Sequence, residues 1–332
     1  MSEKVRIGVI GIGWWSNVLA AGAQRTPNLE IVSCFTRSED KRQAFASEFQ
    51  CRACETYDEL LADPELDGII NTTPNNVHLA TTQQAADLGK HVFLDKPIAT
   101  NVRDGLEITR ICKDAGIVLA MGYQRRREAH FRWVKDKIDN SEFGIMVQAE
   151  ANISRDREGA FEPGHWRFSA EGMPGGVMLQ IGLHYVDVLE MLMGPVAEVS
   201  GMASQLVLKG DNPDVGSLLM KHRNGAISTL NTSYASASEH YVMNIYGREA
   251  SGFFDDQQGL RHLVRGTDKE TRIDVPKNDT IAEQLEEWGR AIRGEGEPEV
   301  GGAEGTQSLA VVLAGVKSVK EGRTVSVEEM YG

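Results

Sequence analysis

The feature that most constrains the fold is a glycine turn near the start of the chain. The apolar run that begins at Val5 predicts a buried strand, and Gly11-Ile12-Gly13 follows it, ahead of a helix that opens with Trp14-Trp15-Ser16. Glycines let such a turn approach a pyrophosphate, which free N–H groups and the positive helix end then stabilise. Ser16 stands where a third glycine usually sits, and its hydroxyl could cap the helix or contact phosphate. The alternative is a tight strand-to-helix turn without a ligand.

Beyond this turn, short β-branched runs alternate with helical patterns as far as Gly122. Such alternation predicts βαβ units, and therefore a doubly wound parallel sheet of Rossmann type within residues 1–122. The predicted strands are residues 6–10, 31–35, 68–71, 91–94 and 118–121, and the predicted helices are residues 39–49 and 77–88.

The pattern changes after Gly122, and residues 123–332 predict a second, α+β domain with a large, mostly antiparallel open sheet. The overall class is therefore α/β. The predicted helices are residues 131–138, 280–293 and 308–320, and the predicted strands are residues 147–153, 196–208, 215–222, 226–233, 241–246 and 250–254.

The composition of the chain limits the kinds of partner that it is expected to bind. Its 332 residues carry a formal net charge of −13, and no basic tract compensates, which argues against nucleic acid and membrane surfaces. We expect a small-molecule substrate instead. No run approaches the ~20 apolar residues of a membrane span, no basic leader opens the chain, and four scattered cysteines do not suggest a disulfide framework. These features predict a cytoplasmic protein, with Cys51 and Cys54 structural on an edge strand.

The end of the second predicted strand bears on cofactor choice. An Asp or Glu about twenty residues beyond the glycines would bind the adenosine ribose of NAD, but Thr36-Arg37-Ser38 occupy that place and the first acid is Glu39. A guanidinium offers paired donors that match phosphate oxygens. The sequence therefore favours NADP, with NAD as the alternative, unless Arg37 is merely an exposed residue at a helix start.

Three further motifs carry a family resemblance: residues 72–78, Gly89 to Pro97 with its Asp95-Lys96-Pro97 element, and Gly175-Gly176 followed by residues 182–187. With these and the closing residues 321–325, the chain resembles the Gfo/Idh/MocA oxidoreductases nearly end to end. The resemblance implies a Rossmann domain, an oligomerising C-terminal α/β domain, and NAD(P)-linked hydride transfer at a secondary alcohol or ketone of a sugar, polyol or cyclic dihydrodiol. It also implies a homodimer or homotetramer formed through the C-terminal sheet.

The resemblance places Lys96 beside the nicotinamide and the reacting carbon. Oxidising an alcohol requires a proton acceptor or a cation at its oxygen, and Lys96 and His184 are the predicted catalytic residues; which of them takes the proton stays open. Asp95 replaces the family's Glu, and the Lys96–Pro97 peptide is a candidate cis bond. Gln180 replaces an Asp that the family often carries four residues before the histidine, so the basicity of His184 and the substrate are open.

The predicted contacts follow from these motifs. The residues predicted to bind the cofactor are Gly11, Ile12, Gly13, Trp14, Trp15, Ser16, Thr36, Arg37, Ser38, Thr72, Thr73, Pro74, Asn76, His78, Asp95, Lys96 and Gln124. The residues predicted to bind substrate are Lys96, Tyr123, Arg126, Trp166, Gln180 and His184. Because arginines cluster in residues 125–127, a carboxylated substrate is mildly favoured. No metal site is expected.

Two other functions fit the same motifs. Some members of the family cleave glycosides by transient oxidation with retained NAD, and others are non-catalytic regulators that sense a dinucleotide. The presence of both Lys96 and His184 argues against the regulator.

Overall fold

The computed structural model describes residues 4–159 and 166–332, and the chain divides into two compact units. The first unit extends to Gln124 and also contains Asp279–Thr306, and the second contains Arg125–Asn278 and Gln307–Gly332. The sequence analysis instead divided the chain once, after residue 122. The chain returns to the first unit because α8 (Thr280–Ile292) buries Leu285 and Trp288 in its core, where Trp288 meets the ring of Phe93 edge-on at 5.9 Å.

The first unit is built on a six-stranded sheet in the order β3-β2-β1-β4-β5-β6, with every pair parallel. Its strands are β1 (Val5–Ile10), β2 (Leu29–Phe35), β3 (Arg52–Ala53), β4 (Gly68–Asn71), β5 (His91–Asp95) and β6 (Leu119–Gly122). This confirms the predicted doubly wound sheet. The strand order reverses between β1 and β4, the point where open α/β sheets bind ligands.

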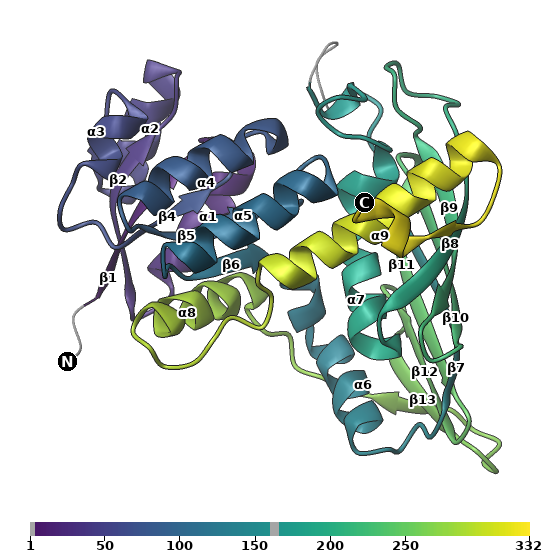
Figure 1. Cartoon of the computed structure of the whole chain (residues 1–332). Helices are drawn as coiled ribbons and strands as arrows, with labels where there is room; N and C mark the ends of the chain where they lie inside the picture. Colours follow the sequence, from purple (N-terminus) through teal and green to yellow (C-terminus); the bar gives the residue numbers. More distant parts are fainter. Residues whose placement is uncertain (1–3, 160–165) are drawn as a thin grey trace. The chain divides into compact units, whose positions relative to one another are not determined.

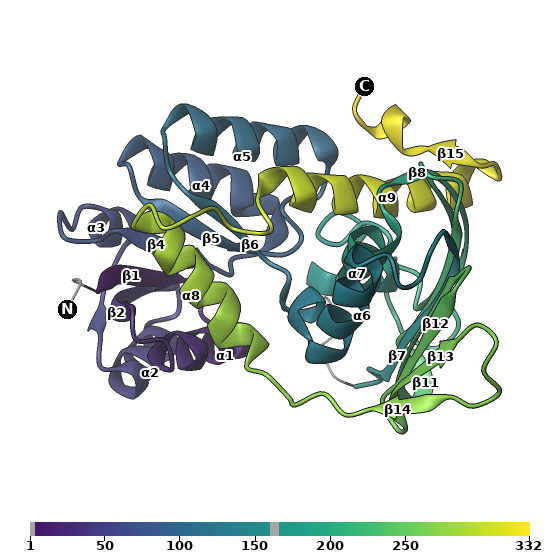
Figure 2. The same ribbon diagram turned by 90° about the horizontal axis from the view of Figure 1, so that it is seen from below.

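Helices cover both faces of this sheet (Figure 2). α1 (Trp14–Gln24), α2 (Glu39–Phe49) and α8 lie on one face, and α4 (His78–Asp87) and α5 (Val102–Asp114) lie on the other. The short α3 (Tyr57–Leu61) precedes β4. β3 coincides with the edge strand predicted around Cys51 and Cys54, whereas α3 and α5 have no counterpart among the predicted helices.

The second unit is built on a nine-stranded sheet in the order β14-β13-β12-β11-β7-β10-β9-β8-β15 (Figure 1). Only β7 and β10 pair in parallel among its described strands, so the prediction of a mostly antiparallel sheet is confirmed. Its strands are β7 (Met146–Asp156), β8 (Val196–Ser204), β9 (Val215–His222), β10 (Ile227–Ser233), β11 (Ala235–Gly247), β12 (Ala250–Asp255), β13 (Gly259–Val264), β14 (Thr271–Ile273) and β15 (Val325–Ser326).

Strand β8 ends earlier than the predicted residue 208. The carboxylate of Asp214 accepts hydrogen bonds from the N–H groups of residues 206, 207 and 208 at 2.7–2.9 Å, which turns the chain away from the sheet. A side chain more distant in sequence thus satisfies backbone donors that a longer strand would have paired.

The helices of the second unit lie on one face of its sheet (Figure 2). They are α6 (Ala129–Asp139), α7 (Leu183–Met193) and the part of α9 (Gly302–Glu321) that follows Thr306. A single π-helical turn (Met178–Gly182) runs directly into α7. The burial of β9 alternates residue by residue, so one face of the strand meets the core and the other is exposed. Among the described helices, none is long and apolar enough to cross a membrane.

Candidate functional site

The glycine turn lies at the carboxyl end of β1. Gly11 has φ +81°, and a Cβ there would lie 2.5 Å from the backbone nitrogen of Thr73, so no other residue fits. Gly13 is extended, and a Cβ there would meet no protein atom within 4 Å. The turn therefore leaves open space against the backbone at the start of α1. The first turn of that helix has no acidic residue of its own, which would oppose an anion at its positive end. These features fit a bound pyrophosphate.

Ser16 stabilises the turn itself. Its hydroxyl accepts a hydrogen bond from the Gly13 N–H at 2.8 Å and donates one to the Gly13 carbonyl at 2.7 Å, and the residue is fully buried. Of the two roles predicted for this hydroxyl, the structure shows the one that caps the helix start.

The loop after β4 is held against the same turn. The Thr72 hydroxyl lies 3.0 Å from the carbonyl oxygens of both Ile10 and Gly11, and the Thr73 hydroxyl donates to the Asn71 side chain at 2.7 Å. Asn76 is exposed. The glycine turn and the loop after β4 thus form one surface at the point where the strand order reverses.

His78 is a positioning residue for this surface. Its side chain is buried, with Nε2 2.9 Å from the Thr73 carbonyl oxygen and Nδ1 3.1 Å from that of Pro97. Burial lowers the pKa of its imidazole. The ring therefore ties the loop after β4 to the segment that carries Lys96, although the sequence analysis assigned it to the cofactor directly.

Lys96 follows β5 at the same edge of the sheet. The Lys96–Pro97 peptide is cis, as the motif predicted. Asp95 accepts a hydrogen bond from the indole Nε1 of Trp15 at 2.9 Å, so the Asp95-Lys96 element is joined to the first turn of α1. The Trp14 and Trp15 rings lie 5.4 Å apart, and Trp14 is exposed. The sequence-predicted cofactor residues are thus brought together around the ends of β1, β4 and β5.

The end of β2 carries the predicted adenosine contacts. Arg37 and Ser38 are exposed, and Ser38 is the N-cap of α2. Arg42 donates to the Thr36 carbonyl at 2.8 Å, which fixes the turn that presents Arg37. Arg37 has no ion pair within the ranges that the structure describes.

The second unit carries His184 and Gln180. Both are buried, but Gln180 lies in the π-helical turn and His184 in the first turn of α7. A spacing of four residues would put both side chains on one face of a regular α-helix, but the π turn breaks that regularity because it places more residues in each turn. Lys96 belongs to the first unit and His184 to the second.

Arg126 has a partner that the sequence analysis did not foresee. Its guanidinium donates to both carboxylate oxygens of Asp187, at 2.9 and 2.5 Å, and both side chains are buried. This bidentate pair connects the segment before α6 to α7, and so it contributes to the structure of the second unit. Tyr123 is also buried, and Gln124 is half-buried. Their predicted ligand contacts stay predictions.

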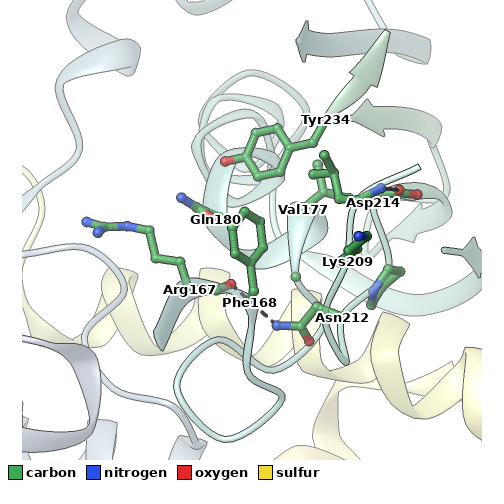
Figure 3. A pocket seen from close by; sticks show the side chains of 11 residues that line it. Arg167, Phe168, Val177, Gln180, Lys209, Asn212, Asp214 and Tyr234 are labelled. Atoms are coloured by element: carbon green, nitrogen blue, oxygen red, sulfur yellow. Dashed lines mark hydrogen bonds between the residues drawn. The ribbon is translucent and has the colours of Figure 1, made fainter. Parts of the chain in front are cut away.

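A small pocket of the second unit holds several polar groups (Figure 3). Arg167, Gln180 and Tyr234 line it, and their polar ends point to the same side. The Arg167 guanidinium lies 4.3 Å from the ring centre of Trp166, a residue predicted to bind substrate, so this ring contacts an arginine of the same chain.

Two arginines that the sequence did not single out lie at the same edge of the sheet: Arg155 is the penultimate residue of β7, and Arg157 follows the last residue of that strand. Within residues 4–159 and 166–332, no three His, Cys, Asp or Glu side chains are placed to share a metal ion.

Comparison with known proteins agrees with this architecture. Residues 5–123 match the model of an oxidoreductase family with an NAD-binding Rossmann fold, and residues 131–252 match the Gfo/Idh/MocA C-terminal domain. A 1,5-anhydro-D-fructose reductase of Ensifer adhaerens is 25% identical, with 97% of this chain and 98% of the relative covered. A myo-inositol 2-dehydrogenase of Thermotoga maritima is 24% identical, with 99% and 100% covered.

A solved structure from Desulfitobacterium hafniense, provisionally named an NADPH-dependent oxidoreductase, is 31% identical with a TM-score of 0.95 and full coverage of both chains. The two family models agree with the Rossmann fold of the first unit and with a second domain that follows it. The chain belongs to the Gfo/Idh/MocA family of NAD(P)-dependent oxidoreductases.

Proposed function

We propose that the protein transfers hydride between NADP(H) and a secondary alcohol or ketone of a sugar, polyol or cyclic dihydrodiol. The observation that carries this proposal is the placement of Lys96, directly after β5 and next to Asp95, at the sheet edge that also holds the open glycine turn. Two relatives that span this chain are named for reactions on an anhydrosugar and on an inositol, which supports the substrate class.

Two side chains of the protein handle the proton. A bound nicotinamide would accept the hydride of the alcohol's C–H bond, and the O–H bond would lose its proton to a side chain as the C=O bond forms. An imidazole has an ordinary pKa of ~6.5, which suits His184 to take that proton near neutral pH, while the Lys96 ammonium stabilises charge on the oxygen. The reverse assignment is the alternative, and the pH profiles of single variants separate the two.

The choice of NADP rests on the end of β2. Arg37 is exposed beside Ser38, the N-cap of α2, and its guanidinium would match the oxygens of a 2′-phosphate. The provisional name of the relative from Desulfitobacterium hafniense points the same way.

The test is a screen of sugars, polyols and dihydrodiols that follows nicotinamide absorbance with NAD and NADP in parallel. For the best substrate, we expect Lys96→Ala to lower kcat/KM by at least about 100-fold, in the range usual for a lost charge stabiliser. The matched control is Lys113→Ala on α5, which should leave turnover unchanged. Full turnover by Lys96→Ala would remove Lys96 from the mechanism.

We further propose a homodimer or homotetramer formed through the open face of the nine-stranded sheet. Leu219, Met202 and Ile227 are exposed on β9, β8 and β10, at 50%, 81% and 44%. Leu219→Asp should lower the molar mass measured by light scattering, because a buried charge without a partner is costly at an interface. An unchanged mass would place the contact elsewhere.

A further inference from the structure

Arginines gather where the one parallel strand pair described in the second unit ends. Because β7 and β10 run in the same direction, their carboxyl ends meet at one edge of the sheet. Arg155 is the penultimate residue of β7, and the N–H of Arg157 donates to the Tyr234 carbonyl at 3.0 Å, just beyond β10. The two arginines are therefore fixed beside Tyr234.

Arg167, which carries a third guanidinium, lines the same pocket as Tyr234. Burial raises the pKa of the Tyr234 hydroxyl, and the charges of Arg155, Arg157 and Arg167 oppose that rise, so all three lie within electrostatic reach of it. Arg155 also lies 5.4 Å from the ring centre of Tyr241. We call Arg155, Arg157 and Arg167 the arginine cluster.

The described acidic groups pair only weakly with Arg155 and Arg157. Glu239 lies 3.9 Å from both Arg155 and Arg157 and is about half-exposed, which makes these ion pairs weak. The Asp214 carboxylate, in the adjoining pocket, accepts three backbone N–H groups. The Nε of Arg155 is buried and has no hydrogen-bond partner within the described residues. Three guanidinium groups thus come together here in a chain of formal net charge −13.

The cluster adjoins the predicted catalytic side of the unit. Arg167 and Tyr234 line the same pocket as Gln180, which precedes His184 by four residues, and the ends of Arg167, Gln180 and Tyr234 face one side of it (Figure 3). Keeping like charges close together is costly unless an anion joins them, and guanidinium groups match carboxylate and phosphate oxygens in pairs.

We propose that the substrate is an anionic sugar or polyol, a sugar acid or a sugar phosphate, whose charged group binds Arg155 and Arg157 with Arg167 beside them. This inference rests on the proposed dehydrogenase function and names the substrate class. It assigns specificity to residues of the sheet edge, instead of to the run at residues 125–127 that the sequence suggested.

Binding is tested without turnover. With saturating NADPH, D-glucuronate and D-glucose 6-phosphate are added in separate thermal-unfolding series, with D-glucose as the neutral match. We expect at least one anion to raise Tm, with added salt weakening the effect, while glucose leaves Tm unchanged. The two anions separate a carboxylate-binding site from a phosphate-binding site. If neither anion raises Tm more than glucose does, the proposal is wrong.

The cluster is then tested by substitution. Arg155→Gln and Arg157→Gln should each raise KM for the preferred anion by about 10- to 100-fold, the usual effect of losing a charge-assisted hydrogen bond, and leave KM for the neutral match within about twofold. Arg272→Gln, on the exposed edge strand β14, is the matched control and should change neither. Arg157→Lys should recover part of the affinity.

The outcomes separate this inference from the proposed function. If the enzyme oxidises neutral sugars as well as anionic ones, with KM insensitive to Arg155 and Arg157, the anionic substrate is ruled out and the dehydrogenase remains. If anions raise Tm through these arginines but no compound in the screen changes nicotinamide absorbance, the anion site stands and the proposed function fails.

Discussion

The indole Nε1 of Trp15 donates a hydrogen bond to Asp95 Oδ1 at 2.9 Å, across 80 residues of sequence. Trp15 lies in the first turn of α1 and Asp95 is the last residue of β5. This bond joins the helix that follows the glycine turn to the residue before Lys96. The two predicted cofactor motifs are therefore mechanically linked within the first unit.

Two substitutions test the hydrogen bond between Trp15 and Asp95 separately from the negative charge of Asp95. Trp15→Phe removes the donor, and we expect it to lower the free energy of unfolding by about 1–2 kcal/mol in urea titrations, because the bond is charge-assisted and partly buried.

Asp95→Asn keeps an acceptor, so its stability should match the wild type. It removes the negative charge beside Lys96, which should move the lysine limb of the kcat/KM pH profile to lower pH. An unchanged profile would show that the carboxylate does not tune Lys96.

Loss of the ion pair between Arg126 and Asp187 should lower the stability of the protein. Because both side chains are buried, Arg126→Met removes the bidentate partner of a buried carboxylate and should lower the free energy of unfolding by about 3–5 kcal/mol, measured by urea denaturation. The double variant Arg126→Met with Asp187→Leu should recover much of this loss. If Arg126→Met instead keeps its stability and only raises KM, Arg126 binds substrate as the sequence suggested.

Local patterns were sufficient for the first sheet, because its βαβ signals lie within a few residues of each other. Gly11, Gly13 and the Asp95-Lys96-Pro97 element were recognisable for the same reason. What the sequence could not show was how partners distant along the chain would pair. Asp187 is 61 residues from Arg126, and α8 enters the core of the first unit after the whole second sheet.

In the second unit, too, local sequence patterns do not predict the features around Gln180, His184 and the arginine cluster. The π-helical turn that separates Gln180 from His184 has no signature in residue types, since a period of four is compatible with either helix. Arg155 and Arg157 become neighbours of Tyr234 only through the parallel pairing of β7 with β10. Strand pairing is decided by tertiary packing, so the arginine cluster lay outside what a local pattern predicts.

Cofactor preference should depend on Arg37. Arg37→Asp replaces a phosphate-binding guanidinium with a group that repels phosphate and can accept the ribose hydroxyls of NAD. We expect the ratio of kcat/KM for NADP to that for NAD to fall by about 100-fold or more. Arg248→Asp, an exposed arginine of the second unit, is the control and should leave the ratio unchanged. A ratio that does not fall would end the 2′-phosphate assignment.

Glu190 should make stability depend on pH. Its carboxylate oxygens accept hydrogen bonds from the Val196 N–H, the Gln307 amide and the Ser308 hydroxyl, yet burial raises its pKa from 4.5 to about 7. The folded protein thus holds this proton more tightly than the unfolded chain does. The resulting stabilisation is complete below about pH 4.5 and is lost as pH rises through about 7.

Glu190→Gln removes this titration while keeping an oxygen to accept from Val196 and Gln307, and an amide to pair with Ser308. The variant should therefore be about 2–3 kcal/mol more stable than the wild type at pH 8, and the difference should shrink toward pH 5, in urea titrations across that range. Glu198→Gln, which removes an exposed carboxylate of β8, is the matched control and should follow the wild-type curve. If Glu190→Gln shows the same pH slope as the wild type, Glu190 is ionised in the fold at neutral pH and its hydrogen bonds outweigh its burial.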